Sequence, residues 1–319
     1  MENSEQRTDL TITECPINED NRLLNIKFMI QEEYRPKAHE IKGQKTPYPG
    51  IQSDMLQQPD SDLSNYKAAD KLKDKVAIIT GGDSGIGRAI AIAFAMEGAD
   101  VAIVYNQNDS DAEETKRMVE AKGRKCLIIK ADVRKKAECF DAIVQTVNTY
   151  GKLNILINNA AFQKTQVRLE DITEEQLRTT FETNIFGYFF MAQAALPHLS
   201  DSDAIVNTGS IVGLTGHQLL VDYTSTKGAI HAFTKSLALQ LGERNIRVNA
   251  VIPGPVWTPI IPATMPIEEV ENFGHEVALG RPGQPEELAP AYVLLASSDG
   301  SFITGALLEV TGGRLSSSN

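Results

Sequence analysis

The chain has 319 residues and 42% apolar content, which is enough for one large hydrophobic core or two small ones. Its net charge of −11 argues against nucleic-acid and anionic-membrane partners, because both require clustered Lys and Arg. No stretch approaches the roughly 20 apolar residues of a membrane span. The scattered Cys15, Cys126 and Cys139 fit neither a disulfide framework nor a metal site. We therefore expect a soluble cytoplasmic protein.

Residues 1–70 differ in composition from the rest of the chain. They are rich in proline, acidic residues and glutamine, and they show no sustained periodicity of 2 or 3.6 residues. This pattern predicts an N-terminal extension that is partly disordered or docked on the surface. The Tyr48-Pro49-Gly50 turn could dock on the rest of the chain or on a neighbouring subunit, and a flexible tail is the open alternative.

From Lys71 onward, short apolar runs alternate with helical segments. The predicted strands are residues 76–79, 101–105, 127–129, 155–157, 204–207, 246–251 and 306–310. Four predicted helices span residues 86–98, 137–150, 223–241 and 285–297. Two more begin at a predicted capping box: one at Ser110 with Glu113, and a long one that runs from Thr173, with Gln176, towards Pro197. Strands that alternate with helices pair in parallel through right-handed crossovers. We therefore predict that residues 71–319 form one α/β domain, a doubly wound Rossmann-type sheet of about seven strands with helices on both faces.

A glycine-rich turn, TGGDSGIGR over residues 80–88, follows the first predicted strand and precedes the first predicted helix. Glycines at such a turn let the backbone approach a pyrophosphate, to which the helix N-terminus offers free N–H groups. No Gly-Lys-Ser/Thr follows, which excludes a Walker loop. Predicted cofactor contacts here are Gly81, Asp83, Ser84, Gly85, Ile86 and Gly87.

The tip of the second predicted strand, Tyr105-Asn106, should lie near the adenosine ribose of a dinucleotide. An Asp or Glu at this tip would bind the 2′-hydroxyl of NAD, and an Arg would favour the phosphate of NADP, but neither is present. With no base nearby, and with Asp83 and Asp109 adding negative charge, we expect NAD or NADP with a lean towards NAD.

Tyr223 and Lys227 lie four residues apart on a predicted helix and therefore share one face. A phenol with a pKa near 10 is a poor acid–base group at neutral pH, and a neighbouring ammonium together with a positive nicotinamide ring would lower that pKa. Lys227 could also hold the ribose hydroxyls. Ser210 could hydrogen-bond the substrate oxygen, and Asn184 could hold a water beside Lys227. Taken alone, the Tyr-x-x-x-Lys spacing is better explained as a surface Tyr–Lys pair.

The combination of these motifs is specific. T-G-x-x-x-G-x-G at residues 80–87, followed in order by Asn159, Asn184, Ser210, Tyr223 and Lys227, resembles the short-chain dehydrogenase/reductase family over about residues 71–314. The resemblance implies catalytic roles for the last four of these residues and further cofactor contacts from Asp132, Val133, Asn159, Ala160, Ala161, Pro253, Gly254, Val256 and Thr258, besides Tyr223 and Lys227. It also implies substrate contacts from Gln163, Ser210 and Tyr223, and a mobile lid over residues 259–273, beside which Trp257 either lines the pocket or anchors the packing.

Within the family, residues 80–88, 184–186, 254–259 and 280–285 are similar to a subgroup of bacterial general-stress dehydrogenases and plant glucose-and-ribitol dehydrogenase homologues. Residues 43–70 fit the proline-containing extension of that subgroup, whereas residues 1–42 do not. The similarity implies a homotetramer packed through the helices that carry Asn184 and Tyr223.

The expected function is an NAD(P)-dependent oxidoreductase that interconverts a small alcohol, polyol or sugar and its carbonyl compound, with Tyr223 as the acid–base group. The alternative is a catalytically silent dinucleotide-binding sensor or scaffold. An enoyl reductase would space its Tyr and Lys more widely than Tyr223 and Lys227, so this reaction is not expected.

Overall fold

The computed structural model describes residues 35–314, of which residues 36–314 lie within one compact unit. Residues 1–34 and 315–319 lie outside the described residues, and with them Cys15 and most of the segment 1–42. Among the described residues, no helix is both long and apolar enough to cross a membrane.

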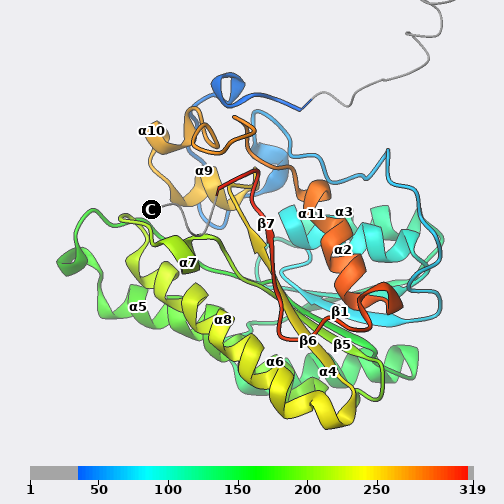
Figure 1. Ribbon diagram of the computed structural model, residues 1–319. Coiled ribbons are helices and arrows are strands. Elements are labelled where there is room, and N and C mark those ends of the chain that lie inside the picture. The colour runs from blue at the N-terminus through cyan, green and yellow to red at the C-terminus, as the bar shows by residue number, and fades with distance from the viewer. Residues whose placement is uncertain (1–34, 315–319) are drawn as a thin grey trace, which may run out of the picture. The chain divides into compact units, whose positions relative to one another are not determined.

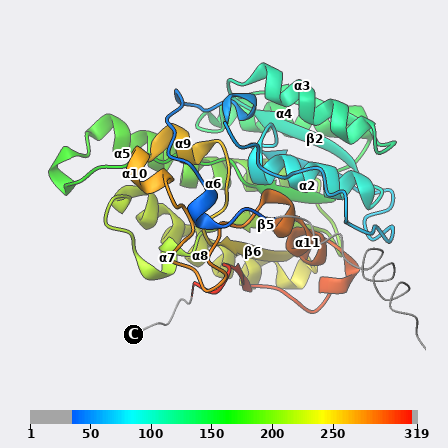
Figure 2. The same ribbon diagram turned by 90° about the horizontal axis from the view of Figure 1, so that it is seen from above.

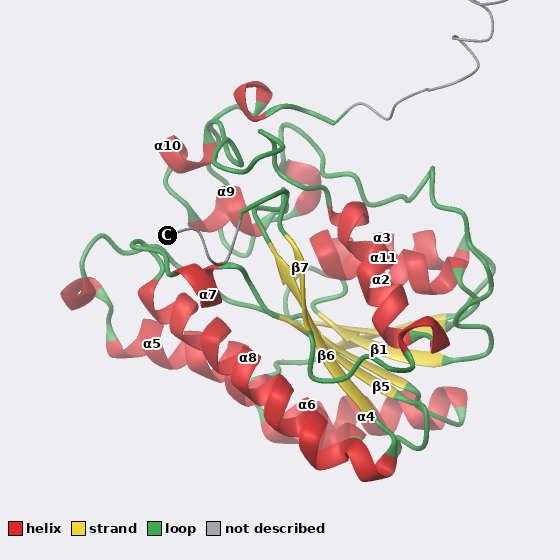
Figure 3. Ribbon diagram, in the orientation of Figure 1, coloured by secondary structure: helices red, strands yellow, loops and turns green. Residues whose placement is uncertain are grey.

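A parallel sheet of seven strands runs through this unit, in the order β3-β2-β1-β4-β5-β6-β7 (Figure 3). The strands are β1 Val76–Thr80, β2 Asp100–Tyr105, β3 Cys126–Lys130, β4 Ile155–Asn158, β5 Ala204–Thr208, β6 Arg247–Pro253 and β7 Leu307–Val310. The continuous apolar runs of β1 and β5 are buried throughout, as expected of strands covered on both faces. The predicted doubly wound sheet is therefore confirmed. The strand order reverses between β1 and β4, which opens a crevice at the carboxyl ends of these strands.

Helices cover both faces of the sheet (Figure 1). One hydrophobic cluster joins the sheet to α2 Gly85–Met96, α3 Asp109–Glu120 and α11 Pro285–Ala296. A second cluster joins the opposite face to α4 Lys136–Tyr150, α6 Gly187–Ala195 and α8 Val221–Leu241. Neighbouring residues of one strand serve different clusters: Ile79 packs in the first and Ile78 in the second. The shorter helices are α5 Glu174–Phe181, α7 Val212–Thr215, α9 Ile260–Thr264 and α10 Ile267–Val270, with 3₁₀ turns at Ala38–Glu40, Gln52–Asp54, Leu169–Asp171, Gly242–Arg244 and Ser298–Gly300.

Two details of the helices differ from the sequence-based predictions. Helix α3 begins at Asp109 with Asn108 as its N-cap, so Ser110 lies inside the helix and the capping box predicted at Ser110 is wrong. The single long helix predicted from Thr173 is divided into α5, a π-helical turn at Glu182–Phe186, and α6. Thr173 is the N-cap of α5, where its side chain accepts the Gln176 N–H.

Residues 36–64, which we call the N-terminal strap, lie over the carboxyl end of the sheet (Figure 2). The strap passes from α9 and α10 to α2 and α11, and backbone hydrogen bonds join Ala38 to Gly280 and Thr46 to Pro262. It therefore borders the same edge of the sheet at which the crevice opens.

Candidate active site

A cavity of ≈ 390 Å³ opens at the carboxyl ends of the strands. The predicted cofactor residues that line it are Gly81, Asp83, Ser84, Gly85, Ile86, Tyr105, Asn106, Asp132, Val133, Asn159, Ala160, Ala161, Tyr223, Lys227, Pro253, Gly254, Val256 and Thr258. Gln163 and Ser210 line it as well, as does His217. Of the predicted site residues, Gly87 and Asn184 lie outside this lining. The cavity thus joins the glycine turn to the Tyr223–Lys227 pair.

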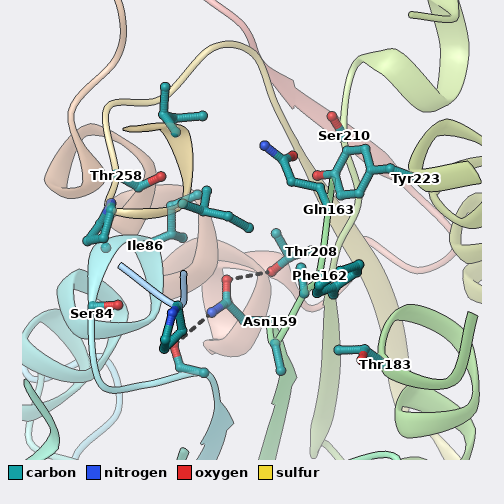
Figure 4. A pocket seen from close by; sticks show the side chains of 18 of the residues that line it. Ser84, Ile86, Asn159, Phe162, Gln163, Thr183, Thr208, Ser210, Tyr223 and Thr258 are labelled. Atoms are coloured by element: carbon teal, nitrogen blue, oxygen red, sulfur yellow. Dashed lines mark hydrogen bonds between the residues drawn. The ribbon is translucent and has the colours of Figure 1, made fainter. Parts of the chain in front are cut away.

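The glycine turn at one end of the cavity requires small residues for two reasons. Gly81 and Gly85 have φ values of +62° and +51°, which favour glycine. A Cβ on Gly87 would lie 1.9 Å from the Gly81 carbonyl oxygen, so this residue lets helix α2 pack against the turn. Asn159 braces the same turn, because its Nδ2 donates to the carbonyl oxygens of Thr80 and Gly81 at 3.1 and 3.0 Å (Figure 4).

The N-terminus of α2 offers backbone donors to an anion. The first intrahelical hydrogen bond runs from Arg88 N to Ser84 O, which leaves the amides of Ile86 and Gly87 without an acceptor inside the helix. The Gly85 amide is engaged elsewhere, since it donates to Gln52 Oε1 at 3.0 Å. Free amides beside a turn that excludes side chains fit the pyrophosphate of a dinucleotide.

At the tip of β2, two of the carboxylates have cationic partners. Lys130 Nζ lies 2.8 Å from Asp109 Oδ1, and Arg134 Nη2 lies 2.6 Å from Asp132 Oδ2. Burial acts to raise the pKa of Asp132, but the hydrogen bonds from Arg134 hold it below its ordinary value. Of the negative charges on which the lean towards NAD partly rested, that of Asp109 is therefore compensated by Lys130, a cation that the sequence pattern did not place there.

At the other end of the cavity, Ser210 and Tyr223 lie beside one another (Figure 4). Helix α8 places Lys227 one turn after Tyr223, with Nζ 5.4 Å from the centroid of the phenol ring. Lys227 Nζ donates to the Thr208 carbonyl oxygen at 2.8 Å, which fixes the ammonium between α8 and the end of β5. The structure thus brings three of the four predicted catalytic residues together.

Burial moves the pKa values of this pair in opposite directions, away from each other. It raises the pKa of Tyr223 to about 12, against a hydrogen bond with Ser210 that acts to lower it. It lowers the pKa of Lys227 to about 7. In the protein alone, loss of hydration dominates at both groups. The lowering of the phenol pKa predicted from Lys227 and the nicotinamide ring together stays a prediction.

Asn184 lies on the π-helical turn, and its side chain is engaged with the protein on all sides. Its Oδ1 accepts the Phe162 N–H at 2.7 Å, while its Nδ2 donates to Phe162 O at 2.9 Å and to Thr226 Oγ1 at 3.0 Å. These bonds tie the loop after β4 to helix α8. This side chain is therefore a structural clamp, and the predicted contact of Asn184 with a water beside Lys227 stays a prediction.

The lid predicted at residues 259–273 contains α9 and α10 and closes the substrate end of the cavity. Gln163 Nε2 donates to Thr264 Oγ1 at 2.9 Å, so a predicted substrate contact also holds the lid. Trp257 is buried against Phe273 and donates its Nε1–H to Gln57 O at 2.8 Å, which makes it a packing anchor. Tyr48 and Pro49 of the strap also line the cavity. The sequence pattern predicts docking of this turn but not its place in the cavity lining.

Comparison with known proteins places this site among dehydrogenases. The family model described as Enoyl-(Acyl carrier protein) reductase matches residues 81–314. General stress protein 39 of Bacillus subtilis (strain 168) is 52% identical over 265 residues, covering 83% of this chain and 93% of that protein. The Glucose and ribitol dehydrogenase homolog of Oryza sativa subsp. japonica is 44% identical over 301 residues, covering 89% of this chain and 98% of that protein. The two groups of relatives indicated by the motifs are therefore confirmed.

Two further comparisons bear on the cofactor. NADPH-dependent aldehyde reductase 1, chloroplastic, of Arabidopsis thaliana is 46% identical over 272 residues, covering 83% of this chain and 94% of that protein. A crystal structure of a short chain dehydrogenase from Burkholderia cenocepacia J2315 in complex with NADP is 32% identical, with a TM-score of 0.72, and covers 76% of this chain and 98% of that one. The lean towards NAD finds no support in these comparisons.

Proposed function

The chain belongs to the short-chain dehydrogenase/reductase family, and on that premise we propose that it interconverts a small alcohol, polyol or sugar and its carbonyl compound with an NAD(P) cofactor. The observation that carries this proposal is the meeting of Ser210, Tyr223 and Lys227 at one end of a cavity whose other end is the glycine turn. In carbonyl reduction a hydride donor and a proton donor have to face the same carbon–oxygen bond, and a cavity that joins these two ends would let a bound cofactor and Tyr223 do so.

The protonation states favour proton donation by Tyr223. Burial raises its pKa to about 12 in the protein alone, so the phenol carries its proton at neutral pH. The positive charges of Lys227 and of a bound nicotinamide would lower that pKa and so ease donation of the proton to a carbonyl oxygen. Ser210 would hold the same oxygen by a hydrogen bond as negative charge develops there. The nicotinamide, when bound, supplies the hydride, and Lys227 would hold the adjoining ribose. The one-turn spacing of Tyr223 and Lys227 speaks against enoyl reduction, whatever the description of the matching family model.

For the cofactor, we propose that the chain accepts NADPH at least as well as NADH. The β2 tip carries the neutral amide of Asn106 in place of a carboxylate, so no fixed charge at this tip repels a 2′-phosphate. The name of the Arabidopsis relative and the NADP in the Burkholderia structure support the same choice.

The substrate class follows from the lining and from the relatives. Gln163 and His217 give the substrate end polar groups suited to hydroxyl-bearing molecules. Relatives are named for glucose and ribitol and for aldehyde reduction. We therefore propose short aldehydes, sugars and polyols as substrates. We also propose a cytoplasmic location and a homotetramer that packs through the helices carrying Asn184 and Tyr223.

The test is oxidation of NADPH and NADH by the full chain across a panel of short aldehydes and sugars, with the reverse reaction on polyols. Tyr223→Phe should lower turnover by at least ~100-fold, because it removes the proton donor, and should leave the dinucleotide dissociation constant within about twofold. Tyr150→Phe removes a phenol hydroxyl on α4, outside the cavity lining, and serves as the matched control. Dinucleotide binding without turnover on any substrate would instead favour the silent sensor.

A further inference from the structure

The two ends of the N-terminal strap are anchored on opposite sides of the cavity. At one end, Lys45 Nζ donates to Met265 O at 2.8 Å, next to the lid helix α9. At the other end, Leu63 N donates to Glu286 Oε2 at 3.0 Å, in the first turn of α11. A segment held at both ends across an opening is a fixed part of its wall.

The middle of the strap contacts the two loops that flank the phosphate end of the cavity. Gly50 O accepts from Asn108 Nδ2 at 3.0 Å, directly after the β2 tip. Gln52 is buried. Its Oε1 accepts a hydrogen bond from the Gly85 N–H at 3.0 Å, and its backbone N–H donates to Asp111 Oδ2 at 3.0 Å. The strap therefore fixes the glycine turn and the start of α3 relative to each other.

Between these anchors, Tyr48 stands at the cavity with half of its surface exposed (50%). Its ring packs edge-on against Phe162, with centroids 5.4 Å apart and planes at 79°. Burial raises the pKa of its phenol, and the charges that act on it are those of Arg134, Asp83 and Asp132. Two residues further along, Gly50 O accepts from Asn108 Nδ2 beside the β2 tip, so Tyr48 lies near the end of the cavity expected to hold the adenosine.

We propose that the strap is a wall of the dinucleotide site and that Tyr48 is a cofactor-binding residue covering the adenosine half. This inference rests on the proposed function and extends it to a segment outside the sheet. An aromatic ring with an open face can contact a ribose or stack on a purine. Because the strap is anchored at both ends, the contact is organised before the cofactor arrives and acts mainly on its release.

The probe for this contact is ADP-ribose, which lacks the nicotinamide, titrated calorimetrically into the full chain. Tyr48→Ala should weaken ADP-ribose binding by roughly three- to tenfold, the effect expected from one aromatic contact. Tyr48→Leu, which keeps apolar volume without an aromatic face, should show the same loss, whereas Tyr48→Phe should stay within about twofold of the wild type. Leu56→Ala is the matched control, because this strap residue is 76% exposed and does not line the cavity.

The outcomes separate this inference from the function on which it rests. Wild-type chain that binds neither ADP-ribose nor NADPH overturns the proposed function. Wild-type binding that Tyr48→Ala and Tyr48→Leu both leave unchanged overturns the role of Tyr48 alone. Stopped-flow displacement of NADPH supplies the second readout, in which the same two variants should release the cofactor faster by a similar factor while Leu56→Ala does not.

Discussion

Burial of the Lys227 ammonium in the candidate active site lowers the stability of the folded chain. The lysine side chain is buried, and burial alone lowers its pKa to about 7, so the charged form is disfavoured in the folded chain. Above about pH 7 the unfolded chain therefore binds more protons at this position than the folded chain does. Stability should consequently rise from about pH 7 towards the ordinary lysine pKa, and below pH 7 the full penalty applies.

We expect Lys227→Met to separate function from stability. It should abolish most turnover and weaken dinucleotide binding about tenfold, because the ammonium that would hold the ribose is removed. The free energy of unfolding should increase at pH 6, since the buried charge is gone, and should match the wild type more closely at high pH. Urea denaturation at several pH values and a dinucleotide titration measure the two effects, and unchanged nucleotide affinity would contradict the proposed dual role.

Asp83 offers a pH-dependent test of the phosphate end. Burial raises its pKa to about 6, reinforced by Asp111 and opposed by Arg88, so its carboxyl loses charge below about pH 6. We expect the affinity for NAD, whose pyrophosphate does not titrate in this range, to rise as pH falls through 6. Asp83→Asn should remove this dependence and tighten binding at pH 8 by about fivefold, the equivalent of ~1 kcal/mol of charge repulsion. The exposed strap residue Asp54 provides the control variant Asp54→Asn, and a wild-type pH profile that persists in Asp83→Asn would refute the assignment.

At the level of secondary-structure elements, the π-helical turn at Glu182–Phe186 is the feature that shapes the site most. π-Helical turns inside α-helices occur frequently at functional sites. Here the turn carries Asn184, whose amide bridges the Phe162 backbone and Thr226. The loop that places Gln163 in the cavity is thereby tied to the helix that carries Tyr223.

Asn184→Leu should therefore lower stability and loosen the site together. The leucine leaves the Phe162 N–H and C=O without these partners in a buried setting, so we expect the free energy of unfolding to fall by about 2–4 kcal/mol. Turnover should fall more than dinucleotide affinity, since the clamp lies beside the reaction centre. Thermal and urea unfolding measure the first effect. A change below ~0.5 kcal/mol would show that the clamp is unimportant.

The elements also show what the sequence could predict and why. Strands such as β1 and β5 were predictable because burial on both faces forces a continuous apolar run, and the glycine turn was predictable because only glycine fits at positions such as Gly87. The π-helical turn was missed because a one-residue change in hydrogen-bond register leaves no mark on composition. The rise in the Tyr223 pKa caused by burial could not be predicted, because the sequence places Lys227 nearby but does not show how far both groups are removed from water.

At the scale of the whole molecule, helix α6 and the residue before it expose aromatic side chains. The side chains of Phe186 and Phe189 are 48% and 42% exposed. The ring of Phe189 packs against that of Phe233 of α8, with the ring centroids 4.3 Å apart. Exposed apolar patches of this kind commonly mark contacts between subunits. They lie on the two helices through which the homotetramer is proposed to pack.

Replacing both exposed phenylalanines, in the double variant Phe186→Ser with Phe189→Ser, should dissociate the proposed tetramer into dimers or monomers at micromolar concentration. Light scattering coupled to size exclusion measures the mass directly. Leu169→Ser changes another exposed apolar residue (67%) on a separate 3₁₀ turn, and it should leave the mass unchanged. A wild-type chain that elutes as a monomer would refute the tetramer, and a double variant that keeps the wild-type mass would place the contact elsewhere.

The position of the strap in the chain has a consequence for biosynthesis. Its anchors join residues far apart along the chain: Lys45 with Met265, Gln57 with Trp257, and Leu63 with Glu286. A ribosome makes the strap early and its partners late, so this segment waits without its docking surface while the central strands emerge. On the proposed function, the nucleotide compartment would be closed on that side only after residues 257–286 have been translated, which would tie cofactor retention to a late stage of synthesis.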